Sequence, residues 1–114
     1  MHYLLLLIGT ILLLPLACHA ETLNLHCEEN NPLFYRDVQV NTLMNRVVID
    51  GKAANNVKIT KEVISFRTNN PPSSSWPVTY FMINRMDGRM SYGAYPDPDQ
   101  MMTVYRCRVQ KQKF

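Results

Sequence analysis

The chain contains no motif of a common enzyme family. A Gly-x-Ser-x-Gly nucleophile, a His-Glu-x-x-His zinc motif and a glycine-rich phosphate loop are all missing from its 114 residues. Histidine is scarce, and His26 is the only one beyond the N-terminal segment. The serine run Ser73 to Ser75 stands in a proline-rich stretch without a nearby base. We therefore expect that the protein is not an enzyme.

Helix-forming segments and an excess of one charge are also missing. The stretches "TKEVIS" and "NTLMNR" could each form about one helical turn, too little for a stable helix. The chain has twelve Lys and Arg and nine Asp and Glu, all after residue 20, which gives a net charge of +3. The basic residues do not cluster as in a nucleic-acid-binding domain, so no nucleic-acid partner is expected.

The N-terminus has the pattern of a secretory signal peptide. Tyr3 to Leu16 is an apolar run of about 14 residues, shorter than the roughly 20 that span a bilayer. Small residues follow up to Ala20, and the sequence turns polar at Glu21, although the first positions lack Lys and Arg. This predicts a signal peptide over residues 1–20, a single domain over 21–114, and a protein exported to the periplasm or secreted.

A lipoprotein is the alternative for the same segment. Leu16-Ala17-Cys18 resembles the end of a bacterial lipobox, in which Cys18 would become the lipidated first residue. Pro15 stands where that pattern has an aliphatic residue. Under this alternative the protein would be anchored to the envelope, and contact with a membrane is expected only in that case.

Cys27 and Cys107 are the other two cysteines, and an even pair in an exported chain indicates a disulfide. The bridge would close a loop of about 80 residues, and loop-closure entropy gives roughly 4.5 kcal/mol of stabilisation. A reactive or metal-binding pair is disfavoured, because the chain has no Cys-x-x-Cys and no histidine near Cys107. Replacing either cysteine by serine is predicted to have the same effect, since each change removes the same bridge.

Apolar and polar residues alternate with a period of two in segment after segment, which is typical of half-buried strands. Turn residues separate these segments, and "TNNPPSSSWP" reads as a surface loop from which Trp76 returns to the edge of the core. We predict an all-β domain, a small antiparallel barrel or sandwich of about seven or eight short strands. The segments are 22–27, 36–42, 45–51, 57–60, 62–68, 78–85, 89–95 and 101–109.

The stretch "NRMDGRM", residues 84–90, predicts a hairpin, because Asp-Gly between alternating runs favours a tight turn. A two-residue turn at Asp87-Gly88 would place Phe81, Ile83, Met90, Tyr92 and Ala94 on one face. A three-residue turn with a bulge would shift the second strand by one residue and exchange its faces. Aromatic and basic residues make this hairpin our candidate binding surface, with Tyr80, Arg85, Arg89, Tyr92 and Tyr95 as its binding residues.

Metal sites are less well supported. His26 and five methionines could suggest a thioether site for Cu(I), but the methionines divide between two faces of the hairpin and are expected to fill the core. The pair Asp97 and Asp99 lacks the glycine and the distal glutamate of a calcium loop. We expect no metal and no other cofactor. The methionines are Met82, Met86, Met90, Met101 and Met102.

Four features together resemble small exported bacterial proteins that have no assigned function. These are a cysteine on the first strand, the V-x-I-D-G hairpin (47–51), the I-N-R-x-D-G-R hairpin (83–89) and a closing Y-R-C (105–107). This resemblance implies a fold more than an activity. Size and compartment are also similar to those of periplasmic lysozyme inhibitors, but their Ser-Gly-x-x-Tyr loop is not matched, because Tyr92 precedes Gly93 here.

The sequence thus favours a non-catalytic β-domain of the periplasm or cell envelope that binds a protein or an envelope component. One alternative is an inhibitor of a hydrolase such as lysozyme. Another is a small hydrolase that acts on envelope polymers through a pair of acids.

Overall fold

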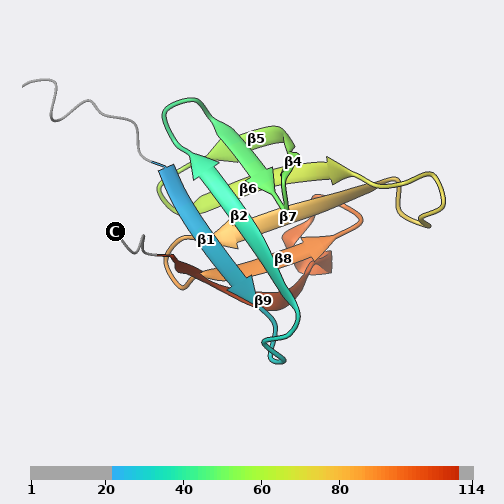
Figure 1. Ribbon diagram of the computed structural model, residues 1–114. Helices are drawn as coiled ribbons and strands as arrows, with labels where there is room; N and C mark the ends of the chain where they lie inside the picture. The colour runs from blue at the N-terminus through green and yellow to red at the C-terminus, as the bar shows by residue number, and fades with distance from the viewer. Residues whose placement is uncertain (1–21, 111–114) are drawn as a thin grey trace, which may run out of the picture.

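A computed structural model describes residues 22–110, which form nine β-strands and one turn of 3₁₀ helix (Figure 1). The predicted signal peptide and Cys18 lie outside these residues. The eight predicted strands are all present, and the ninth is the two-residue strand β4. The elements are β1 (Thr22–Glu28), β2 (Tyr35–Asn41), β3 (Arg46–Ile49), β4 (Lys52–Ala53), β5 (Asn55–Ile59), β6 (Val63–Asn69), β7 (Val78–Asn84), β8 (Arg89–Gly93), η1 (Pro98–Gln100) and β9 (Met102–Val109).

The strands form one antiparallel sheet in the order β4-β3-β2-β1-β9-β8-β7-β6-β5, which curls into a nearly closed barrel (Figure 1). The Ala54 N–H donates to the Val47 carbonyl (2.9 Å) and extends the β3–β4 pair by one residue. The Asn45 side chain donates to the Val57 carbonyl (3.0 Å). Closure leaves little free strand edge, which an open sheet of this size would expose. The all-β prediction is confirmed, as a barrel-like sheet.

Pairing of the first strand with the last turns two meanders into one sheet. Strand β1 pairs with β9 in antiparallel register, and Cys27 lies directly opposite Cys107. The two cysteines form a disulfide across this pair, as predicted. The covalent bond therefore joins the strands whose contact closes the barrel. A disulfide indicates that the protein matures in an oxidising environment.

Inward-facing residues of seven strands make the buried core, and β5 adds the partly buried Val57 and Ile59, whereas β4 contributes none. Alternation fixes which side chains point inward, so strand after strand contributes every second residue. Phe66 and Phe81 stack with their ring centroids 5.2 Å apart, and Met90 is completely buried. The buried side chains are Leu25, Cys27, Val38, Val40, Val47, Ile49, Ile64, Phe66, Phe81, Ile83, Met90 and Tyr105.

The two Asp-Gly pairs form different turns. Asp50 and Gly51 both have positive φ (49° and 81°) and make a two-residue hairpin turn, with Ile49 opposite Lys52. Between β7 and β8, however, the loop has four residues, Arg85 to Gly88, and Ile83 lies opposite Met90. Both shorter turns expected there were wrong. The two-residue turn would have paired Ile83 with Tyr92, so the observed register differs from it by two residues. Because side chains alternate with a period of two, the residues predicted to share a face under that alternative still do so.

Within residues 22–110, no helix is long and apolar enough to cross a membrane.

Candidate functional site

Four connections fall at one end of the barrel, which we call the loop end. They are residues 29–34 between β1 and β2, Asp50-Gly51 between β3 and β4, residues 70–77 between β6 and β7, and residues 94–101 between β8 and β9. In an up-and-down antiparallel sheet every second connection falls at the same end. Figure 1 shows the β1–β2 and β6–β7 connections projecting from the barrel.

Exposed aromatic side chains are concentrated at this loop end. All four aromatic residues classed as exposed among residues 22–110 lie there, namely Phe34, Tyr35, Trp76 and Tyr95. Leu33 is 81% exposed beside them, on a turn that Asn31 holds by accepting the Leu33 N–H (3.0 Å). The exposed large apolar residues at the opposite end are aliphatic: Leu43, Met44, Met86 and Val109.

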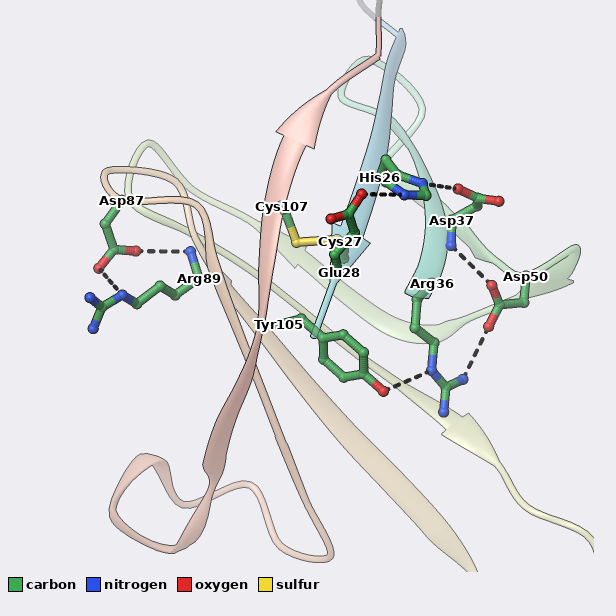
Figure 2. The surroundings of a disulfide bond; sticks show 10 residues. All are labelled: His26, Cys27, Glu28, Arg36, Asp37, Asp50, Asp87, Arg89, Tyr105 and Cys107. Carbon is green, nitrogen blue, oxygen red and sulfur yellow. Dashed lines mark hydrogen bonds and ion pairs between the residues drawn. A yellow bond between two sulfur atoms is a disulfide. The ribbon is translucent and has the colours of Figure 1, made fainter. Parts of the chain in front are cut away.

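Arg36 lies at the loop end and reaches across the barrel mouth. Its Nε donates to the Tyr105 hydroxyl (3.4 Å), and its Nη1 pairs with Asp50 Oδ2 (3.1 Å), as Figure 2 shows. The guanidinium carbon lies 5.7 Å from the centre of the Phe81 ring, within range of a cation–π contact. Strands β2, β7 and β9 and the β3–β4 turn are thus tied together around one cation.

Partial burial lowers the pKa of Arg36, but the Tyr105 hydroxyl and the Asp50 carboxylate outweigh this and raise its pKa above the ordinary value. Arg36 therefore keeps its charge at any physiological pH. About 41% of its side chain is exposed, so the cation can still contact a molecule that approaches the loop end.

A line of aromatic rings runs from Arg36 along the mouth of the barrel. Tyr92 lies 6.2 Å from Tyr105 on one side and 6.2 Å from Trp76 on the other, between ring centroids. Next to this line, a hollow of about 350 Å³ opens between the β1–β2 connection and the barrel. Its wall combines apolar, acidic and basic groups: Glu29, Leu33, Phe34, Tyr35, Arg36, Asp50 and Tyr105.

The five predicted binding residues do not form one surface. Tyr95 lies at the loop end, and Tyr92 points inward to the aromatic line. Tyr80 is partly buried on the outer face of β7, opposite Gly93. Arg85 and Arg89 lie at the other end of β7 and β8. Arg85 donates to the Thr60 carbonyl (2.7 Å), and Arg89 lies 4.0 Å from Asp87.

His26 is bound between two carboxylates on the outer face. Nδ1 lies 3.0 Å from Asp37 Oδ1, and Nε2 lies 3.0 Å from Glu28 Oε1 (Figure 2). Its ring packs against Tyr35 with centroids 4.9 Å apart. Both nitrogens face acids rather than a hydroxyl or a thiol, which is not the arrangement of a base beside a nucleophile.

The methionines do not gather around His26. Met90 is buried in the core, as expected of core filler, whereas Met86 is 79% exposed in the β7–β8 loop. Asp97 accepts the Asp99 N–H (3.0 Å) and caps the turn η1. No group of three or more His, Cys, Asp or Glu able to hold a metal occurs within the described residues.

Sequence reasoning missed Arg36 and the β1–β2 connection. A weak signal was available in "NNPLFY", where a turn sequence is followed at once by three large apolar residues. Such residues have no alternation that would bury them, so exposure was foreseeable. The position of Arg36 over Phe81 was not foreseeable, because 45 residues of sequence separate the two side chains.

Comparison of the chain with protein-family models, with curated proteins and with solved structures finds no match.

Proposed function

We propose that this protein is a non-catalytic binding module of the periplasm or cell envelope, and that it holds a protein partner at the loop end of its barrel. One observation carries the proposal: the four exposed aromatic side chains of residues 22–110 lie at that end, and two of them, Phe34 and Tyr35, line the same hollow as Arg36. Tyr, Trp, Phe and Arg are enriched at the centres of protein interfaces.

The rigidity of the surroundings supports the same proposal. Arg36 is held by the hydrogen bonds that it donates to Tyr105 and Asp50, and the aromatic line packs on the core residues Phe81 of β7 and Tyr105 of β9. A surface that is ordered before binding loses less conformational entropy when a partner docks. The disulfide is consistent with work outside a reducing compartment, where export would place the protein.

The test is a pull-down from envelope extract with wild-type protein and two sets of variants. Tyr35→Ala combined with Trp76→Ala removes two aromatic side chains of the loop end, and both are on the surface. We expect the specific partner to be lost, or its affinity to fall at least tenfold. Met86→Ala, which changes an exposed residue at the opposite end, is the matched control and should keep the partner.

A second pair of substitutions separates this proposal from the hairpin surface predicted from sequence. Arg85→Ala with Arg89→Ala alters the β7–β8 end of the barrel without touching the loop end. We expect this variant to keep the partner. If it loses the partner while Tyr35→Ala with Trp76→Ala keeps it, the binding surface is at the wrong end of the barrel and the proposal fails.

A further inference from the structure

Two arginines lie directly opposite each other on neighbouring strands, outside the loop end. Arg89 of β8 is paired in register with Arg106 of β9. Both are exposed, and each alternates with a buried neighbour, Met90 or Tyr105, so both side chains leave the outer face of the sheet. Like charges that face each other across an antiparallel pair are destabilising. The repulsion between these two arginines therefore lowers the stability of the folded state at this point.

Nearby acids do not remove this cost. Arg106 makes no hydrogen bond or ion pair with its side chain within residues 22–110. Glu28 lies opposite it on β1, but its carboxylate contacts His26 (3.0 Å) and Arg108 (3.3 Å) instead. Asp87 is 4.0 Å from Arg89 Nε and is already an acceptor for the Arg89 N–H (3.0 Å).

A groove follows the outer face of β9 past these side chains. It has a volume of about 750 Å³, and Arg89, Arg106 and Arg108 all line it. Glu28, Glu29 and Asp87 line it as well, and two of these three acids are engaged as described. Arg106 thus has no ion-pair partner of its own within the described residues, in a groove whose lining holds three arginines and three acids. A second arginine lies opposite it, and a third lies two residues further along the same strand.

We propose that Arg89 and Arg106 bind a phosphoryl group in this groove, which adjoins the loop end and shares Glu29 and Tyr105 with the hollow there. A guanidinium presents a planar fork of N–H donors that suits phosphate oxygens. A tetrahedral phosphoryl group carries enough oxygens to accept from two forks at once, which a carboxylate with two oxygens cannot do as fully. Its negative charge would also remove the repulsion between the two arginines. The group could belong to free phosphate or to a lipid headgroup.

The test compares thermal unfolding of the purified protein in phosphate and in chloride at equal ionic strength, which keeps screening constant. A ligand that binds the native state raises the melting temperature by mass action. We expect phosphate to raise it for the wild type, and Arg106→Gln to cut that rise to less than half. Arg46→Gln, an exposed arginine on β3, is the matched control and should keep the full rise.

The melting temperature of Arg106→Gln in chloride separates a binding role from a structural one. Removal of a like-charge contact should leave this temperature unchanged or slightly raised. A fall of several degrees, relative to Arg46→Gln, would mean that Arg106 supports the fold and would overturn the proposal.

Sedimentation with vesicles distinguishes the two sources of the phosphoryl group. Vesicles that contain phosphatidylglycerol should bind the wild type, but not Arg89→Gln combined with Arg106→Gln, if the headgroup of a lipid is the ligand. A phosphate-dependent rise in melting temperature without vesicle binding would indicate a small phosphorylated ligand. The proposal is rejected if neither effect occurs, or if both survive the double substitution.

Discussion

Asp50 joins two elements of the loop end through its two carboxylate oxygens. Oδ1 accepts the backbone N–H of Asp37 (3.0 Å), and Oδ2 pairs with Arg36 (3.1 Å). The residue also has a φ of +49°, a left-handed conformation that Asp and Asn adopt more easily than Ala. Charge, hydrogen-bond acceptance and backbone conformation are therefore three separate contributions of one side chain.

Two substitutions at Asp50 separate these contributions. Asp50→Asn keeps an acceptor and the tolerance of positive φ, and we expect it to cost less than about 1 kcal/mol, because half-exposed ion pairs contribute little. Asp50→Ala also strains the backbone and leaves the Asp37 N–H without its acceptor, so we expect a cost of about 2–3 kcal/mol. Urea denaturation measures both. Equal costs would show that the ion pair, rather than the turn, dominates.

At the scale of elements, the two Asp-Gly connections show how the surroundings select a turn. In the β3–β4 turn, which hydrogen-bonds to β2, no atom outside its neighbours lies within 4 Å of a Cβ built on Gly51. The β7–β8 loop contacts two other elements. Arg85 N–H donates to the Glu62 carbonyl (2.7 Å), and the Gly88 carbonyl accepts the Cys107 N–H (2.6 Å). These contacts hold the longer, four-residue loop in place.

The two glycines should therefore respond differently to the same substitution. Both have positive φ, so Gly51→Ala should cost about 1–2 kcal/mol from backbone strain alone. A Cβ on Gly88 would lie 2.7 Å from the Cys107 carbonyl oxygen, so β8 and β9 would have to separate. We expect Gly88→Ala to cost about 2–5 kcal/mol. Urea denaturation with the disulfide intact compares them, and similar costs would contradict the close approach.

At the scale of the whole molecule, the disulfide joins residues 80 apart and closes the barrel at the β1–β9 pair. Reduction restores the entropy of a long loop in the unfolded chain, worth roughly 4.5 kcal/mol at most. We expect the melting temperature to fall by more than about 10 °C in reductant, since each kcal/mol shifts a domain of this size by several degrees. Calorimetry measures the change, and two free thiols in the native protein would contradict it.

Burial changes one expectation about the single cysteine variants. From sequence, Cys27→Ser and Cys107→Ser were expected to behave alike. Cys27 is completely buried, however, while Cys107 is only partly buried. A serine at 27 places a hydroxyl in the core, so Cys27→Ser should cost about 1–2 kcal/mol more than Cys107→Ser. Urea denaturation of the two variants compares them, and reductant should affect neither. Equal losses of stability would support the prediction from sequence that the two variants behave alike.

Much of the fold could be predicted from the sequence, because the signals are local. Alternation identified eight strands and placed Phe81, Ile83 and Met90 on one face, and all three are buried. Two cysteines beyond the N-terminal segment allowed a single pairing, and this pairing is present. A side-chain period of two also preserved the faces of β7 and β8 although the loop between them was mispredicted. These features can be predicted from residues that are neighbours in the sequence, or from the number of cysteines.

The candidate site could not be predicted in this way, because residues distant in sequence build it. The predicted residues Arg85 and Tyr95 are near each other in the chain but lie at opposite ends of the barrel, since each strand reverses direction. Arg36 and Tyr105 are 69 residues apart, and the pairing of β1 with β9 brings them together. Local alternation determined which side chains face outward. The order and register of the strands, which depend on long-range pairing, decided which of them share a surface.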